Sequence, residues 1–141
     1  SASGVIAAGV AVATVHPRVR AAMAEREPPT RPAAWLALHI PLGTVWSEEA
    51  AYRAALGTVA AEAFGPRAGQ LLQAAAFGMS HIHDARVSGA PVIPTILATG
   101  AAGWVFGWLA DRSGSLAAPM LAHLAVNEAG AVAALAVRQL D

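Results

Sequence analysis

An uncharged run of 20 residues, from Pro91 to Ala110, limits what this chain can fold into more than any other feature. A helix rises about 1.5 Å per residue and the hydrocarbon layer of a bilayer is about 30 Å thick, so about 20 apolar residues cross it. Asp111 and Arg112 follow the run at once. The run is therefore predicted to be a transmembrane helix.

Four other apolar segments extend this pattern to about five helices. They are Ser1 to Val15, Pro32 to Leu56, Ala68 to His83 and Leu116 to Val137. The first is shorter than a full span and is interpreted as the remaining end of a helix, so an N-terminal helix is expected to be missing. Strands are not expected, because an open sheet edge leaves its backbone groups unsatisfied in hydrocarbon. The predicted fold class is an all-α, polytopic transmembrane helix bundle of about five helices, forming one membrane-embedded domain over residues 1–141.

Composition supports this prediction and excludes several classes of protein. Hydrophobic residues make up 56 % of the chain, charged residues 13 %, and the formal net charge is zero. Such a chain is neither a disordered segment nor a nucleic-acid-binding protein, since it has no basic surface to hold phosphates. The absence of cysteine excludes disulfides and a thiol nucleophile. We expect a multi-pass protein of the cell membrane whose constant partner is the lipid bilayer.

The segment from residue 16 to residue 32 is predicted to be a loop outside the bilayer. It carries four arginines and four prolines. Basic residues favour the cytoplasmic side under the positive-inside rule. A second local pattern, Gly103-x-x-x-Gly107, predicts that a neighbouring helix approaches the Pro91 to Ala110 helix closely.

Three polar clusters interrupt the apolar segments, and each charged group in a span costs at least about 2.5–3.5 kcal/mol. The first cluster is Glu48-Glu49-Ala-Ala-Tyr-Arg53. Glu49 and Arg53 are four residues apart, so they share a helix face and can form an ion pair. Glu48 lies about 100° away from that face, and a carboxylate left over in an apolar setting is suited to accept a proton. The alternative is a helix that leaves the membrane at Ser47 with a solvated charged face.

The other two clusters each place two side chains on one helix face. Phe77 and His81 are four residues apart, and so are His123 and Asn127. A histidine near a helix end can also be a capping or interfacial residue, an interpretation that suits His83 well. His123 and Asn127 could instead hydrogen-bond between helices.

Together the clusters supply a carboxylate, two imidazoles and an amide from three helices. A membrane-embedded hydrolytic site needs a base to activate water and donors to stabilise the oxyanion. The H-E-x-x-H zinc motif is absent from the sequence. Ser47 and Ser80 lack the G-x-S-x-G context of a serine nucleophile.

These clusters, in this order, resemble the signature of the CPBP family, the CAAX-protease and bacteriocin-processing intramembrane endopeptidases, also called Abi or type II CAAX proteases. The family pattern is E-E-x-x-x-R, F-x-x-x-H and H-x-x-x-N, each on its own transmembrane helix. The likeness covers Pro41 to Gly130. It implies a multi-pass membrane endopeptidase that acts on a peptide or protein substrate.

The resemblance also implies a role for each matching residue. Glu48 would activate water together with His81, while His123 and Asn127 would stabilise the oxyanion. Glu49, Arg53 and Phe77 would be supporting residues. No cofactor is required by this scheme. Zinc remains an open alternative, because Glu48, His81 and His123 could also ligate it.

Two other classes of function compete with the endopeptidase. One is a non-catalytic multi-pass immunity or scaffold protein that keeps its polar core for helix packing. The other is a small proton-coupled transporter with a relay through Glu48 and His81. The sequence leaves the identity and prenylation of the substrate, the oligomeric state and the membrane orientation open.

Overall fold

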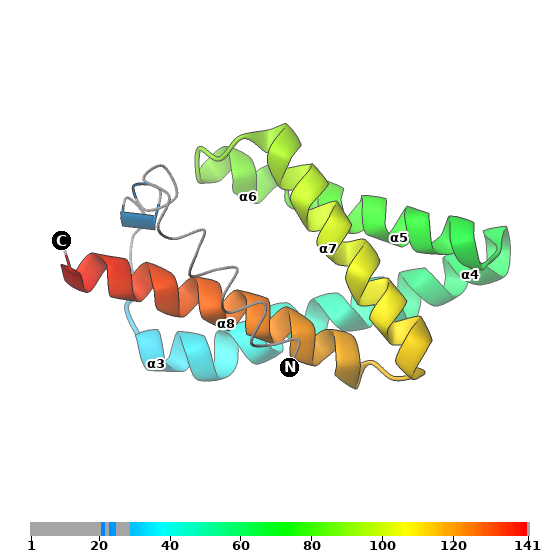
Figure 1. The fold of residues 1–141 in the computed structure, drawn as a ribbon, viewed down its shortest axis with the longest axis horizontal. Helices are drawn as coiled ribbons and strands as arrows, with labels where there is room; N and C mark the ends of the chain where they lie inside the picture. Colours follow the sequence, from blue (N-terminus) through cyan, green and yellow to red (C-terminus); the bar gives the residue numbers. More distant parts are fainter. Residues whose placement is uncertain (1–20, 22, 25–28, 141) are drawn as a thin grey trace. The chain divides into compact units, whose positions relative to one another are not determined.

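The structure is a computed structural model that describes residues 21, 23, 24 and 29–140, and these residues are helical apart from short turns (Figure 1). The main elements are α3 (Pro32–Ala34), η1 (Trp35–Trp46), η2 (Glu49–Gly57), α4 (Thr58–Phe64), α5 (Pro66–Ser80), α6 (Ile82–Val87), α7 (Val92–Ser113) and α8 (Ala117–Leu140). The described residues contain no strand, which confirms the all-α prediction. The apolar segment Ser1 to Val15 lies outside the described residues. The loop prediction for residues 16–32 is wrong at Ala21, Met23, Ala24 and Pro32, which are helical.

The chain divides into two compact units, which are described separately below. The terminal unit comprises Ser1–Val45 and Leu121–Asp141, and the central unit comprises Trp46–Met120. The predicted single domain over residues 1–141 stays a prediction.

In the central unit, α4 and α5 form an antiparallel hairpin around Gly65. Gly65 has a φ of 85°, a conformation that glycine adopts without steric cost. Pro66 then occupies the first position of α5, where its fixed φ suits a helix start and its missing N–H is not needed. A Cβ at Gly69 would lie 2.5 Å from the backbone nitrogen of Ala61, so the two helices approach to backbone contact.

The most extensive helix contact in the central unit joins α5 to α7. Glycines on both helices make it possible. A Cβ at Gly78 of α5 would lie 2.6 Å from the carbonyl oxygen of Ile96, and one at Gly103 of α7 would lie 2.8 Å from the Phe77 ring. Gly107 faces the Gln73 amide in the same way, at 2.5 Å. The close approach predicted from Gly103-x-x-x-Gly107 is therefore confirmed.

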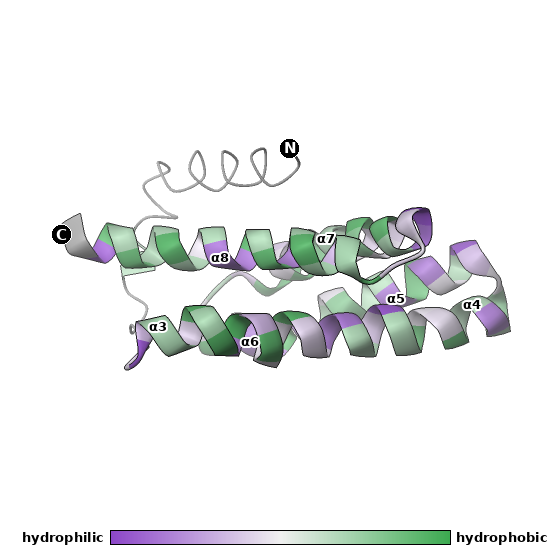
Figure 2. Cartoon of the chain, turned by 90° about the horizontal axis from the view of Figure 1, so that it is seen from below, coloured by the Kyte–Doolittle hydropathy of each residue, from purple (hydrophilic) through white to green (hydrophobic). Residues whose placement is uncertain are grey.

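Two helices of the described residues are long and apolar enough to cross a membrane, Val92–Ser113 and Ala117–Arg138. Only 17 % of the apolar window of each is buried, whereas the core helix of a soluble protein is mostly buried. Large side chains such as Ile93 and Leu97 of α7 are 70 % and 67 % exposed. Figure 2 shows apolar residues along most of α7 and α8. Lipid is the solvent that such surfaces fit.

The α7 helix starts one residue after the predicted span and ends three residues beyond it. Asp111, Arg112 and Ser113 continue the helix, and Gly114 ends it in the left-handed conformation with a φ of 62°. A glycine at this position caps a helix C-terminus because it has no Cβ to clash. The α7 helix therefore continues beyond its apolar section by one turn that contains Asp111 and Arg112.

In the terminal unit, η1 has the wider turns of a π-helix and contains Pro41. Proline has no N–H to donate to the preceding turn, which disturbs regular α-helical hydrogen bonding. The buried residues of η1 are Ile40 and Val45, and α8 contributes buried Ala131 and Val137.

Candidate active site

The first polar cluster forms a buried ion pair in the central unit. Arg53 Nε lies 3.3 Å from Glu49 Oε2, and the two side chains are 1 % and 0 % exposed. Arg53 Nη2 also donates a hydrogen bond of 3.3 Å to the carbonyl oxygen of Gly103 in α7. A buried ion pair needs such additional hydrogen bonds to offset the loss of hydration. The predicted pairing of Glu49 with Arg53 is confirmed.

Aromatic rings surround the Arg53 guanidinium. Its central carbon lies 4.3 Å from the ring centre of Phe77, 5.2 Å from that of Phe106 and 5.9 Å from that of Tyr52. A guanidinium over a ring face is attracted by the negative face of the ring. Phe77 of the second motif thus packs on the arginine of the first motif, which links the two motifs in space.

Gln73 belongs to the same polar core, and the sequence motifs did not single it out. Its Nε2 donates a 3.1 Å hydrogen bond to the carbonyl oxygen of Gly103, which also accepts from Arg53. Gln73 is 2 % exposed. Its position four residues before Phe77, in a helix rich in Ala and Leu, was the available signal, because that spacing puts both side chains on one face.

His81 lies where α5 ends and α6 begins, and its imidazole is held in one tautomer. Its Nδ1 lies 2.8 Å from the carbonyl oxygen of Phe77, which can only accept, so Nδ1 carries the proton. In the neutral ring Nε2 then has the free lone pair. The His81 and Phe77 rings lie 4.9 Å apart, edge to face, which confirms that these residues share a helix face.

Glu48 immediately precedes η2 and is partly exposed, unlike the fully buried Glu49. The adjacent carboxylates are thus in different surroundings. This difference in burial agrees with the prediction that Glu48 and Glu49 lie on different faces of the helix.

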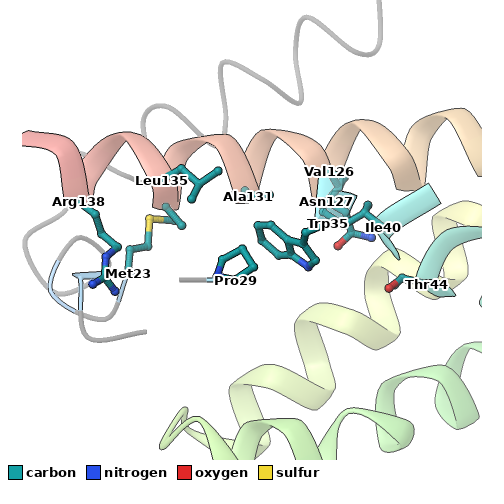
Figure 3. Close-up of a pocket in the computed structure, with 12 residues that line it drawn as sticks. Met23, Pro29, Trp35, Ile40, Thr44, Val126, Asn127, Ala131, Leu135 and Arg138 are labelled. Carbon is teal, nitrogen blue, oxygen red and sulfur yellow. The ribbon is translucent and has the colours of Figure 1, made fainter. Parts of the chain in front are cut away.

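The third motif lies in the terminal unit, on α8. His123 is 5 % exposed. Asn127 lines a pocket of about 480 Å³, and Figure 3 shows it beside Trp35 and Ile40. Its Nδ2 is buried without a hydrogen-bond acceptor among the residues that the structure describes. Leu135 contributes to the apolar lining of the same pocket.

The four predicted catalytic residues are divided between the two units. Glu48 and His81 belong to the central unit, and His123 and Asn127 to the terminal unit. Their convergence on one cavity stays a prediction. Over residues 21, 23, 24 and 29–140, the structure contains no group of three His, Asp or Glu side chains placed to hold a metal ion. The zinc alternative draws on residues of both units and also stays untested.

Comparison with known proteins identifies the family. The model of the type II CAAX prenyl endopeptidase Rce1-like family matches residues 30–129, a range that contains all three motifs. Comparison with curated proteins finds no match. Comparison with solved structures finds none either. Because the family model covers more than half of the chain, this membrane-embedded protease belongs to the type II CAAX prenyl endopeptidase Rce1-like family.

Proposed function

We propose that the chain is a multi-pass intramembrane endopeptidase of the cell membrane, built on about five helices, in which Glu48 activates the hydrolytic water. The observation that carries the mechanism is the buried Glu49–Arg53 ion pair. Glu49 balances the positive charge of Arg53, and the carboxylate of Glu48 is then available for a different role. Glu49 stabilises the helices, and Glu48 acts as the general base.

His81 supports the proposed chemistry through its tautomer. With Nδ1–H donating to the Phe77 carbonyl, Nε2 is the nitrogen that accepts a proton. Glu48 and His81 together remove a proton from water, and the resulting hydroxide attacks the carbonyl carbon of the scissile peptide. The proton then passes to the leaving amine as the tetrahedral intermediate collapses.

Asn127 and His123 are proposed to stabilise the oxyanion. An oxyanion hole needs donors that are already in place and shielded from water. The buried Nδ2 of Asn127, without an acceptor among the described residues, has this property. The proposal requires that Asn127 face the same substrate carbonyl as Glu48.

The pocket beside Asn127 suits the apolar part of a substrate. Trp35, Ile40 and Leu135 line it, and apolar pockets with few polar groups are typical of small-molecule and lipid-chain sites. The family is described as a prenyl endopeptidase. The proposed substrate is therefore a peptide or protein with a prenylated C-terminal Cys-a-a-X sequence.

The experiment uses the purified chain in proteoliposomes with matched prenylated and unprenylated peptides, and mass spectrometry identifies the products. We expect cleavage of the prenylated peptide at one bond. Gly130→Phe fills the pocket, because a Cβ at Gly130 meets no atom within 4 Å. This variant is expected to raise KM for the prenylated peptide by about tenfold, comparable to the loss of one well-buried apolar group.

The matched control is Ala136→Phe, an exposed position of the same helix that does not line the pocket. It is expected to leave KM unchanged. Equal kinetics of the two variants would contradict the role of the pocket. The absence of any cleavage product from a folded preparation would contradict the peptidase itself and favour the scaffold or transporter alternative.

A further inference from the structure

A second pocket, of about 590 Å³, lies entirely within the central unit. Residues of η2, α4, α5 and α7 line it. Glu62 of α4 and Asp111 of α7 are exposed lining residues. Its buried lining residues are Arg53, Gln73 and Gly107, and the first two are 6 % and 2 % exposed. The pocket therefore runs from an acidic, exposed end to a buried polar end.

Two polar atoms at the buried end have neither a hydrogen bond nor an ion pair among the described residues, whereas Arg53 Nε, which also lacks a hydrogen bond, faces Glu49 Oε2 at 3.3 Å. Arg53 Nη1 and Gln73 Oε1 are both buried without a hydrogen-bond partner among the residues that the structure describes. Their side chains are neighbours, because Arg53 Nη2 and Gln73 Nε2 both donate to the carbonyl oxygen of Gly103, at 3.3 and 3.1 Å. Leaving a buried polar atom without a partner costs about 1–3 kcal/mol, and more for a charged group. The two atoms together therefore favour a polar ligand strongly.

The chemistry of these atoms identifies the ligand. It must accept a hydrogen bond from the Arg53 guanidinium and donate one to the Gln73 amide oxygen. Water does both with one oxygen atom. An anion would satisfy Arg53 but not Gln73, and Glu62 and Asp111 would repel it at the exposed end. A lipid chain would satisfy neither atom.

We propose that this pocket is hydrated inside the membrane protein, with a water molecule bound between Arg53 Nη1 and Gln73 Oε1. The volume is ample, since a water molecule occupies about 30 Å³ in the liquid. Bound water hydrates the guanidinium of the Glu49–Arg53 pair from the side that the carboxylate leaves open. The pocket thus conducts water from the ends of α4 and α7 to the polar core.

Hydration here has a consequence for catalysis that rests on the proposed function. A peptidase in the bilayer consumes one water molecule for each bond that it cleaves. The pocket brings water to Arg53, whose ion-pair partner Glu49 is the sequence neighbour of the proposed base Glu48. The hydration itself does not depend on the enzymatic activity and is tested without it.

The native chain contains no cysteine, so single cysteines can report the presence of water at chosen positions. Ala110→Cys probes the pocket near Asp111, and Gly57→Cys probes the buried end, because a Cβ at Gly57 lies 3.9 Å from Gln73 Cγ. Ala101→Cys is the control, an exposed position of α7 outside the pocket that faces lipid in a membrane-spanning helix. The full chain is labelled in proteoliposomes with a permanently charged methanethiosulfonate. Silver ion, which is close to water in size, is the second probe at position 57.

Only the ionised thiol reacts, so water contact decides the rate, and we expect Ala110→Cys and Gly57→Cys to react more than about tenfold faster than Ala101→Cys. At position 57, fast blocking by silver ion alone also supports the proposal, because the larger reagent is then excluded by size. Ala61→Cys, another lining position, replaces Gly57→Cys if that variant does not fold. Lining cysteines that react with both probes as slowly as Ala101→Cys would overturn the proposal. Neither result depends on peptide cleavage, so a failure here is distinct from a failure of the proposed function.

Discussion

At the scale of single residues, the polar core of the central unit depends on a few side chains that satisfy one another. Arg53 is the centre of this core. It pairs with Glu49, donates to the Gly103 carbonyl and lies over the Phe77 ring. These groups are buried away from water. Removing one partner therefore leaves the others buried without compensation, which lowers the stability of the fold.

Replacing Glu49 by glutamine is therefore expected to destabilise the protein. Arg53 would stay buried without its counter-charge, and breaking a buried pair in this way costs about 3–5 kcal/mol. Thermal unfolding in detergent, followed by circular dichroism, measures the effect. Glu62→Gln removes an exposed carboxylate and is the matched control, with no change expected. Equal melting temperatures for the two variants would contradict the structural role of the ion pair.

His81→Asn separates the two nitrogens of the imidazole. The asparagine amide can replace Nδ1 as donor to the Phe77 carbonyl, but it has no equivalent of Nε2. We expect a native melting temperature and a loss of activity of about 10²- to 10⁴-fold, the usual contribution of a general acid–base group. Wild-type activity in this variant would show that His81 has a structural role only.

At the scale of secondary-structure elements, glycines set how closely α5 and α7 pack. Both helices expose several large apolar side chains, and the contact between them combines the buried rings of Phe77 and Phe106 with close backbone approach. This contact also fixes the Gly103 carbonyl beside Arg53 and Gln73. A change in the packing of α5 against α7 would therefore also move the hydrogen-bond acceptor of Arg53 and Gln73.

Gly78→Ala tests this packing. The new Cβ would lie 2.6 Å from the carbonyl oxygen of Ile96, a backbone atom that cannot move away cheaply. Overpacking of this kind costs about 1–3 kcal/mol. The control is Gly100→Ala on the facing helix, where the nearest atom, the Ala74 carbonyl oxygen, is at an ordinary 3.5 Å. Chemical unfolding in mixed micelles compares the two variants, and equal stability would contradict the close approach.

The sequence predicted the elements better than their details. The absence of charge from Pro91 to Ala110 was sufficient to locate α7, because only an apolar helix of that length fits a bilayer. The helix continues past the predicted run to Ser113, because Asp111 and Arg112 end the apolar stretch but not the helix, which Gly114 caps in the left-handed conformation. The π-helical turns of η1 and η2 leave no clear periodic signal in the sequence.

The candidate site was predictable where its residues are neighbours in sequence. The spacing of Glu49 and Arg53 gave their ion pair, and that of Phe77 and His81 gave their shared face. The roles of Gln73 and the Gly103 carbonyl were not predictable, because they depend on how α5 and α7 pack. Long-range contacts of this kind are properties of the tertiary structure.

At the scale of the whole molecule, the chain is a membrane protease with polar groups inside apolar helices. Zinc catalysis would need three protein ligands, and Glu48, His81 and His123 are those on offer. Using Glu48 as a ligand would leave Glu49 as the base, although Arg53 already engages it. We therefore expect catalysis without an obligatory metal ion.

Chelation tests this expectation. Activity in proteoliposomes should survive treatment with a strong chelator and desalting, and metal analysis should find zinc well below one ion per chain. Stoichiometric zinc in the active protein, with activity lost on chelation and restored by zinc, would contradict metal-free catalysis. It would instead favour the ligand set of Glu48, His81 and His123.

The most direct test of glutamate catalysis compares the wild-type chain with Glu48→Gln. Both proteins are placed in identical proteoliposomes, and cleavage of the prenylated peptide is followed by mass spectrometry while thermal unfolding is measured in parallel. The amide keeps the size of the side chain but cannot take a proton from water, so we predict an unchanged melting temperature and a loss of cleavage of at least about 10²-fold. A folded Glu48→Gln protein that cleaves at the wild-type rate would contradict the proposed mechanism.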